Sequence, residues 1–380
     1  MDFKLSAENR MIVKAAKDFA KRVIEPVAAK IDSEDYLPED ILSKYAEARM
    51  LGMTVPKEYG GLGTGAFNVI LITEELAKAG SSAFWPMAVN NSVTETIYYW
   101  GTEEIRKKYI PLLCNGTNYA GVAFTEPGTG SDPRAITATA VPDGDYYILN
   151  GVKRFVTHGQ LKGYSIFFAK DETGRVTAFI LEKNTEGYTY TKPYALMGLG
   201  GQGLVDVFLK NVRVHKSDIL GEKGKGFKIL LKWIASERVQ QMAYMVGAGQ
   251  ACLDESIKYT SERIVGGKPM NSMQGIQWML AEMYASIEAC RWWTYRLALK
   301  QDEGGCSIEM DSAALKLFTV PAIQEVARKA LQLHGSYGYC KDYKIERLYR
   351  VIAHAGVTAS STELQKTIVG STLARSALNR

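Results

Sequence analysis

The chain has 380 residues, of which 46% are hydrophobic and 23% are charged. This composition is typical of a soluble folded protein with room for two or three packed layers. Lysine and arginine (46) exceed aspartate and glutamate (41) by only five, and the excess is spread along the chain, so a nucleic-acid-binding surface is not expected.

The cysteine pattern and the N-terminal sequence favour a cytoplasmic protein. The first residues, MDFKLSAENRM, are charged and lack the apolar region of a signal peptide. No apolar run approaches the roughly 20 residues of a membrane span. Free thiols in a reducing compartment are expected, without a metal site, because the cysteines show no CxxC pair and no metal-ligand spacing. They are Cys114, Cys252, Cys290, Cys306 and Cys340.

Residues 1–118 are predicted to form a helical domain. Apolar residues between Ile12 and Ile24 recur at three- and four-residue spacing, as in an amphipathic helix, and Ser6 is a suitable helix start. Further helices are predicted over 38–52, 66–79, 86–99 and 103–113, separated by glycine and proline.

The period changes at residue 119, and a β domain is predicted over 119–224. Its segments are short, rich in β-branched and aromatic residues, and separated by turn sequences at 142–145 (PDGD) and 171–174 (DETG). This pattern indicates an antiparallel sheet. Nothing in the sequence resembles a βαβ unit, so a Rossmann domain is not expected. A helical domain is predicted over 225–380, with long helices at 225–260, 272–300, 308–335 and 361–378.

The loop FTEPGTGSD, residues 124–132, can place polar groups against a planar ring or a phosphate. Gly128 and Gly130 permit close approach of the backbone, and Thr125 and Ser131 supply hydroxyl groups. An ordinary loop between two domains has the same composition, so the spacing alone leaves both interpretations open.

Three further stretches each allow a structural and a functional interpretation. In NGVKRFVTHG, 150–159, a type I′ turn at Asn-Gly followed by a strand would put Phe155 and Thr157 on one face. That face is either core packing or a surface behind a ligand. Arg263, near a helix end, is either a cap or a group that grips a pyrophosphate. QLHGSYGY, 332–339, is a glycine-containing helix end.

These motifs, with SERVQQMA at 236–243, resemble the acyl-CoA dehydrogenase family in order and over essentially the whole chain. Phe155 stands where the family usually has tryptophan, His158 where it usually has asparagine, and Gly266 where it has an aromatic residue. The resemblance implies an α+β fold with an N-terminal helical domain, a middle antiparallel β-barrel and a C-terminal four-helix bundle. It also implies a homotetramer, FAD at a subunit interface, an acyl-CoA thioester substrate, and an electron-transferring flavoprotein or similar acceptor.

The resemblance also assigns site residues by matched position. Ser131 would reach the thioester as well as the flavin, and Arg238 would approach the CoA moiety. Phe84, Trp85 and Met87 suggest an apolar, ring-shaped acyl pocket, with core packing as the alternative. The residues that would contact the cofactor, with Arg263 and Gln274 reaching the FAD of a neighbouring subunit, are Phe124, Thr125, Ser131, Phe155, Thr157, Arg263, Gln274, Gln332, Gly335, Ser361 and Glu363.

The family's catalytic base is missing from its usual place. The family reaction removes an α proton of the thioester while a β hydrogen leaves as hydride to the flavin, so a carboxylate must accept the proton. Aligned without gaps from residues 349–350, the segment VTASSTELQ (357–365) has Ala359 at the position of that glutamate. A methyl group cannot accept a proton, so the base has moved or the reaction differs.

Three hypotheses follow. In the first, Glu237 is the base for ordinary α,β-dehydrogenation of a short or branched acyl-CoA, as in isovaleryl- and long-chain-type members, unless it is only a solvated or ion-paired carboxylate. In the second, which we favour, the chain resembles the branch that converts cyclohex-1-ene-1-carboxyl-CoA to cyclohexa-1,5-diene-1-carboxyl-CoA by 1,4-elimination. Asn91 then occupies the position of that branch's aspartate base and would be a substitution of that aspartate. The alternative is that Asn91 is an ordinary helix residue that hydrogen-bonds locally. In the third, the chain is a non-catalytic flavin-binding member that associates with nucleic acid, which the modest charge disfavours.

Overall fold

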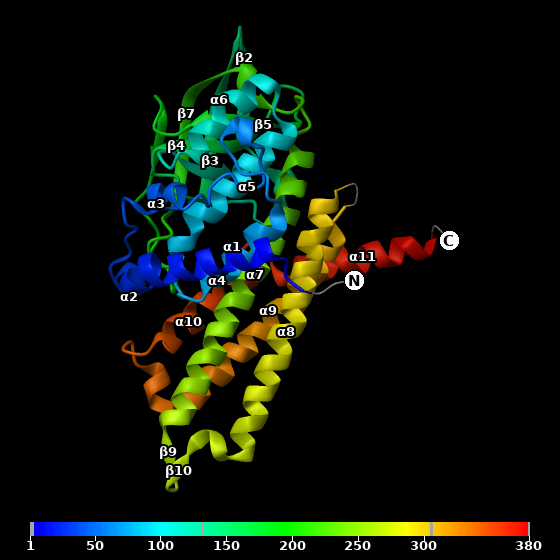
Figure 1. Cartoon of the computed structure of the whole chain (residues 1–380). Helices are drawn as coiled ribbons and strands as arrows, with labels where there is room; N and C mark the ends of the chain where they lie inside the picture. The colour runs from blue at the N-terminus through cyan, green and yellow to red at the C-terminus, as the bar shows by residue number, and fades with distance from the viewer. Residues whose placement is uncertain (1–3, 131, 305–306, 379–380) are drawn as a thin grey trace.

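The computed structural model describes residues 4–130, 132–304 and 307–378, arranged as an N-terminal helical region, a middle sheet and a set of long C-terminal helices (Figure 1). This order of regions agrees with the sequence prediction. Ser131 and Cys306 lie outside the described residues. In the described ranges, no helix is both long and apolar enough to cross a bilayer.

The N-terminal helices begin and end where local side chains allow. The Ser6 hydroxyl accepts a hydrogen bond from the Asn9 backbone N–H, and the Asn9 side chain bonds back to Ser6, a capping box that satisfies free N–H groups. The helix predicted over 38–52 is shorter because Arg49 adopts a left-handed φ of 56°. The helices are α1 (Ala7–Phe19), α2 (Glu25–Glu34), α3 (Ile41–Glu47), α4 (Ala66–Ala77), α5 (Trp85–Trp100) and α6 (Glu103–Cys114), with a π-helical segment at Ala20–Ile24.

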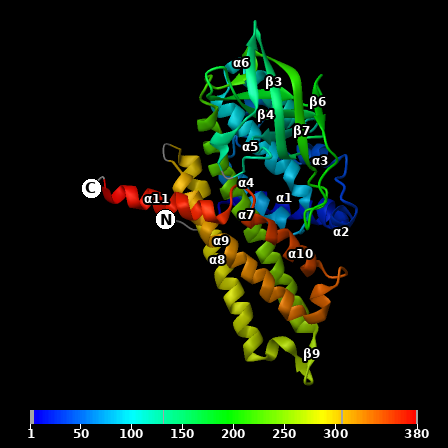
Figure 2. The ribbon, with the colours of Figure 1, turned by 180° about the vertical axis from the view of Figure 1, so that it is seen from behind.

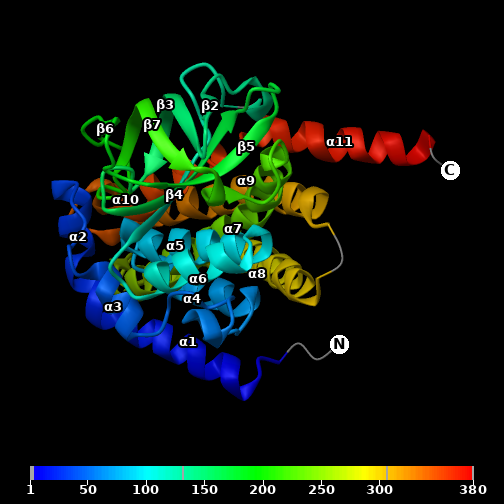
Figure 3. The same cartoon turned by 90° about the horizontal axis from the view of Figure 1, so that it is seen from above.

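α4 and α5 are the inner helices of this region. Nearly every residue of α4 is buried, as expected for a helix that is apolar on all sides. Its buried Glu74 accepts hydrogen bonds from Arg291 Nε at 2.9 Å and from the Tyr295 hydroxyl at 2.7 Å. Figure 3 shows the sheet on one side of α5 and α6, with α4 and then α1 on the other. This layering places α5 between the sheet and α4, and α5 also contacts α7.

The middle region is a single sheet with the order β6-β7-β3-β2-β4-β5-β8, and β1 pairs with β4. Most neighbouring strands pair antiparallel, as predicted. The departure from the prediction is at β4, which pairs in parallel with β1, with Tyr119 opposite Gly163, and with β2 at one residue pair. β1 follows α6 directly and not through a hairpin, so no tight turn imposes an antiparallel neighbour. The strands are β1 (Tyr119–Ala123), β2 (Thr139–Asp143), β3 (Tyr146–Thr157), β4 (Gly163–Lys170), β5 (Val176–Glu182), β6 (Tyr188–Tyr190), β7 (Leu204–His215) and β8 (Ile219–Leu220).

The turns predicted at 142–145 and 171–174 connect β2 to β3 and β4 to β5. The type I′ turn predicted at Asn150 and Gly151 is wrong, because both residues lie inside β3, where the register with β7 shifts. Gly151 has a φ of 150°, and a Cβ there would lie 2.6 Å from the Ala138 Cβ. The glycine therefore permits a bulge and a close approach of chain segments instead of a chain reversal.

The C-terminal region is built on three long helices that pack along one another. They correspond to three of the four long helices that were predicted, and the fourth corresponds to α11. A short helix that was not predicted, α10, packs against α7 and α9, and α11 contacts α9 and then projects from the body (Figures 1 and 2). α7 has 37 residues and is about 55 Å long. The elements are α7 (Gly226–Glu262), β9 (Ile264–Val265), β10 (Lys268–Pro269), α8 (Gln274–Glu303), α9 (Glu309–His334), α10 (Lys344–Ala353) and α11 (Thr362–Leu378).

Candidate active site

The middle region presents an exposed aromatic ring beside two available hydroxyl groups. Thr125 follows β1 and Thr157 ends β3; both are half-buried, and neither hydroxyl is hydrogen-bonded within the described part of the chain. The two segments are joined because the Arg154 N–H donates to the Thr125 carbonyl at 2.7 Å. Phe155 is 52% exposed and Val156 is buried. The register of β3 with β7 shifts just before Val156, and Phe155 adopts a left-handed φ of 57°. The arrangement suits a planar ligand.

A buried ion pair, which the motif analysis did not identify, anchors the glycine loop beside this surface. Lys153 Nζ lies 2.7 Å from Glu126 Oε1, and both side chains are almost completely buried. Glu126 also accepts a hydrogen bond from the Thr137 N–H at 2.7 Å. At Gly128 and Gly130, by contrast, no heavy atom lies within 4 Å of a Cβ position. The loop is therefore fixed at its base and open at its tip.

Phe124 connects the ring-binding surface to α7. Its half-buried ring packs edge-on against Trp233, with 6.0 Å between ring centroids. The Trp233 indole N–H donates to the Ser92 hydroxyl on α5 at 3.3 Å. Trp233 is one helical turn before Glu237, so the glycine loop and the candidate base come from adjoining parts of the structure.

Glu237 is a buried carboxyl on α7. The residue is 8% exposed and makes no hydrogen bond or ion pair with any described residue. Burial raises its pKa to about 7, and the positive charge of Lys316 counteracts part of that shift. A carboxyl that titrates near neutral pH can both accept and donate a proton. These properties favour Glu237 as an acid–base group over a solvated or ion-paired carboxylate.

Glu237 lies on the face of α7 that meets the segment before α11. Residues four and seven positions further along a helix share a face, and here Gln241 donates to the Thr358 hydroxyl while the Tyr244 ring lies 5.6 Å from the His354 ring. The two segments run in opposite directions, so an earlier residue of α7 meets a later residue of the other segment. Glu237 therefore lies on the face of α7 that meets the chain just after Thr358, which includes Ala359.

The turn at Ala359 and Ser360 has an unusual backbone and is held by a buried lysine. Ala359 and Ser360 both adopt left-handed conformations, with φ of 47° and 76°. Lys316 on α9, which is fully buried, donates to the Thr358 carbonyl, to the Ser360 carbonyl at 2.7 Å and to Gln241 Oε1 at 3.3 Å. Lys316 was not among the predicted site residues.

Asn91 has a structural role in this fold. Its Nδ2 donates to the Met50 carbonyl at 2.8 Å and to the Met87 carbonyl at 2.9 Å, and its Oδ1 accepts from the Met53 N–H at 2.8 Å. The side-chain amide is thus fully used inside the core. A carboxylate here would turn an acceptor toward two carbonyl oxygens. The geometry argues against Asn91 as the stand-in for an aspartate base.

The residues predicted to line the acyl pocket are buried. Trp85 belongs to an aromatic cluster, with ring centroids 6.4 Å from Tyr244 and 6.1 Å from His354, and Met87 has no exposed surface. Arg238, predicted to approach CoA, has a buried Nε without a hydrogen-bond partner in the described structure, and burial lowers its pKa to about 10. Its guanidinium is available to an anionic ligand.

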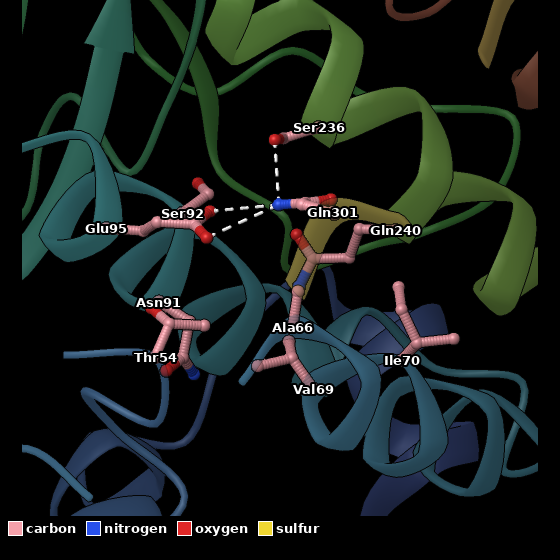
Figure 4. A pocket seen from close by; sticks show the side chains of 10 residues that line it. All are labelled: Thr54, Ala66, Val69, Ile70, Asn91, Ser92, Glu95, Ser236, Gln240 and Gln301. Carbon is pink, nitrogen blue, oxygen red and sulfur yellow. Dashed lines mark hydrogen bonds between the residues drawn. The ribbon is translucent and has the colours of Figure 1, made fainter. Parts of the chain in front are cut away.

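A small polar cavity lies between α4, α5, α7 and α8 (Figure 4). Its volume of about 30 Å³ is enough for about one or two water molecules. Gln301 Nε2 donates to the Ser236 hydroxyl at 2.9 Å and to the Glu95 carboxyl at 3.3 Å. Burial raises the pKa of Glu95 to about 7. Glu95 is a half-buried acid that was not among the predicted site residues.

A second set of predicted cofactor residues lies at the opposite end of the molecule. α7 and α9 end there and α8 begins, beside β9 and β10 and remote from the sheet (Figures 1 and 2). One chain therefore does not bring this set to Phe155. At the start of α11, Ser361 is half-buried and Glu363 is exposed. The distant set, all exposed, is Arg263, Gln274, Gln332 and Gly335.

Comparison with known proteins identifies the family. Three family models match: the acyl-CoA dehydrogenase N-terminal domain over 6–117, the middle domain over 121–212 and the C-terminal domain over 224–374. A 3-(aryl)acrylate reductase of Clostridium sporogenes is 37% identical over 96% of this chain and 98% of its own. CarC, a subunit of the caffeyl-CoA reductase–Etf complex of Acetobacterium woodii, is 33% identical over 97% and 98%.

Among solved structures, butyryl-CoA dehydrogenase from Megasphaera elsdenii matches with a TM-score of 0.95 and 30% identity, covering 98% of this chain and 100% of the other. The predicted succession of a helical, a β and a second helical domain is confirmed by this match and by the three domain models. The chain therefore belongs to the acyl-CoA dehydrogenase family of oxidoreductases.

Proposed function

We propose that this protein is an FAD-dependent enzyme that interconverts an acyl-CoA and its 2-enoyl-CoA counterpart, with Glu237 as the group that exchanges the α proton. The observation that carries this proposal is the position of Glu237. It is a buried, unpaired carboxyl in the described structure, on the face of α7 that meets the segment containing Ala359. Relatives named for dehydrogenation and for reduction support a reaction that this site can run in either direction.

The surface around Phe155 fits a flavin. Its exposed ring lies beside the unpaired hydroxyls of Thr125 and Thr157, and the open glycine positions of the adjacent loop leave room for a heterocycle. FAD, when bound, accepts the β hydrogen of the acyl chain as hydride. Structures of related proteins named for their FAD or FADH2 complexes support the cofactor assignment.

Glu237 suits proton transfer in both directions. In dehydrogenation the ionised carboxyl takes the α proton, whose acidity depends on hydrogen bonds to the thioester carbonyl. In reduction the protonated carboxyl gives a proton to the α carbon. A pKa of about 7 keeps both forms populated at neutral pH. Arg238, next in sequence, offers its unpaired Nε to the anionic part of CoA.

A second copy of the chain would complete the cofactor site. The distant set that includes Arg263 and Gln274 cannot reach Phe155 of its own chain, so these residues would serve another subunit. Trp278 and Tyr284 on α8 are 61% and 57% exposed, and exposed aromatic residues are enriched at interfaces. These features support the homotetramer implied by the family resemblance. The relative named as a subunit of an Etf complex supports an electron-transferring flavoprotein as the redox partner.

The contacts of Asn91 argue against the 1,4-elimination hypothesis. It requires a carboxylate at Asn91, whereas the amide there bonds three backbone groups that an aspartate could not satisfy. No observation favours the nucleic-acid-associated alternative.

The Glu237→Gln variant tests the proposal. The FAD-loaded protein is mixed anaerobically in D₂O with butanoyl-CoA or 3-phenylpropanoyl-CoA, and deuterium incorporation at the α carbon and flavin bleaching are followed. Both rates should fall by about 10²–10⁴-fold at unchanged FAD content. Glu47→Gln, at an exposed carboxyl of α3, is the matched control. Exchange at the wild-type rate in Glu237→Gln would refute the assignment.

A further inference from the structure

Lys316 is a buried cation that no carboxylate contacts within the described residues. Its side chain has no exposed surface. An ammonium has three N–H donors, and here all three go to neutral oxygens, those of Thr358, Ser360 and Gln241. A buried charge without a counter-ion costs several kcal/mol. An apolar side chain would fill this place at lower cost, so stability alone does not account for a lysine.

The oxygens that Lys316 binds belong to the strained turn at Ala359 and Ser360. Ala359 and Ser360 are consecutive non-glycine residues with left-handed φ, a conformation that is sterically unfavourable for residues with a Cβ. The carbonyls that receive the ammonium are those of Thr358 and Ser360, on both sides of Ala359. Gln241 bonds the lysine and also the Thr358 hydroxyl. Together these bonds tie the turn to α7 one helical turn after Glu237.

Lys316 is also the positive charge that acts most directly on Glu237. Of the other titratable groups nearby, Arg238 belongs to the same helix, His354 is kept neutral because burial lowers its pKa to about 4, and Glu95 lies in the cavity on the adjoining side of α7. The charge of Lys316 lowers the pKa of Glu237 against the effect of burial. Burial and Arg238 lower the pKa of Lys316 itself to about 7, and Glu237 raises it.

We propose that Lys316 is a positioning residue of the active site, whose ammonium fixes the turn at Ala359 and supplies the positive charge that faces Glu237. This inference rests on the proposed role of Glu237. Before proton transfer the ammonium favours the ionised carboxyl that can accept the α proton. After transfer the carboxyl is neutral and the ammonium no longer attracts it, so Lys316 also favours release of the proton.

Lys316→Met and Lys316→Arg separate the charge from the geometry. α-Proton exchange and kcat/KM are measured with butanoyl-CoA or 3-phenylpropanoyl-CoA across a pH series. In Lys316→Met the acid limb of the profile should move up by about one pH unit, and the rate at neutral pH should fall about fivefold or more, with a smaller change in KM. Lys316→Arg keeps the charge but cannot bond all three oxygens alike, so kcat should fall while the acid limb stays in place.

Lys14→Met, at an exposed lysine of α1, is the matched control and should change neither profile. A Lys316→Met enzyme with the wild-type acid limb and kcat would overturn the proposal, whatever its melting temperature. Should Lys316→Met fail to fold with FAD, Lys316→Arg decides, because wild-type kcat in that variant would equally overturn it. Failure of the Glu237 assignment is recognised separately, since Glu237→Gln would then keep α-proton exchange.

Discussion

Replacing Asn91 with aspartate should destabilise the protein and should not create a base. Nδ2 donates to the carbonyls of Met50 and Met87 at 2.8 and 2.9 Å, and an aspartate oxygen in its place cannot donate. Two buried carbonyls would lose their partner at about 1–3 kcal/mol each, so the expected loss is about 2–6 kcal/mol before the burial of the new charge is added. The bond accepted from the Met53 N–H would survive.

The assay is thermal unfolding followed by tryptophan emission and flavin release. The melting temperature of Asn91→Asp should fall by about 5 °C or more at neutral pH. The deficit should narrow as the pH falls toward about 4, because a protonated carboxyl donates one bond. Asn115→Asp is the matched control, since Asn115 uses only its oxygen, which accepts from the Thr117 N–H and hydroxyl. Wild-type stability of Asn91→Asp together with conversion of cyclohex-1-ene-1-carboxyl-CoA to the diene would refute this reasoning.

Three further outcomes are expected. Adding Ala359→Glu to Glu237→Gln should raise α-proton exchange by about tenfold or more over Glu237→Gln alone, because Ala359 belongs to the segment that meets the Glu237 face of α7; no gain in D₂O would contradict the proposed proximity of the two positions. In the wild type, Glu237 must be ionised to take a proton, so the rate of dehydrogenation should rise with pH through about 7 and that of enoyl-CoA reduction should fall, which stopped-flow measurements across a pH series would check. Lys153→Met leaves Glu126 buried and unpaired, and should lower the free energy of unfolding by about 3–5 kcal/mol; denaturation and flavin content measure this, and an unchanged midpoint would count against the ion pair as an anchor.

The sequence predicted the elements whose signals are local. Apolar residues that recur every 3.6 residues over long stretches predicted α7, α8 and α9. Glycine-containing turn sequences predicted the hairpins of the sheet. The sequence prediction failed where packing against a distant segment determines the local conformation. An Asn-Gly pair signals a tight turn, but the approach of Ala138 makes Gly151 part of a bulge, and the parallel partner of β1 is set by packing that no local pattern encodes.

The same distinction applies to the site. The family motif located Glu237, but only the fold shows that its carboxyl is buried and unpaired among the described residues. The hydrogen bonds of Asn91 could not be predicted from the sequence, because two of its three partners, Met50 and Met53, come from a loop about 40 residues earlier. Lys316 did leave a weak signal in the sequence, because it is a charged residue between the small and apolar positions Ala313 and Val320 of a predicted helix. The same face also carries Ser312 and Thr319, so the pattern alone does not single out the lysine.

The length of α7 links catalysis to assembly. Glu237 and Arg263, at the end of the helix, are separated by about 39 Å along one rigid rod. Under the proposed assembly, one copy of α7 places its proton-transfer group in its own site and its far end in a neighbour's cofactor site. FAD binding would then depend on subunit association and therefore on the protein concentration. Dilution that separates the subunits would release FAD and activity together, and concentrated protein would regain both.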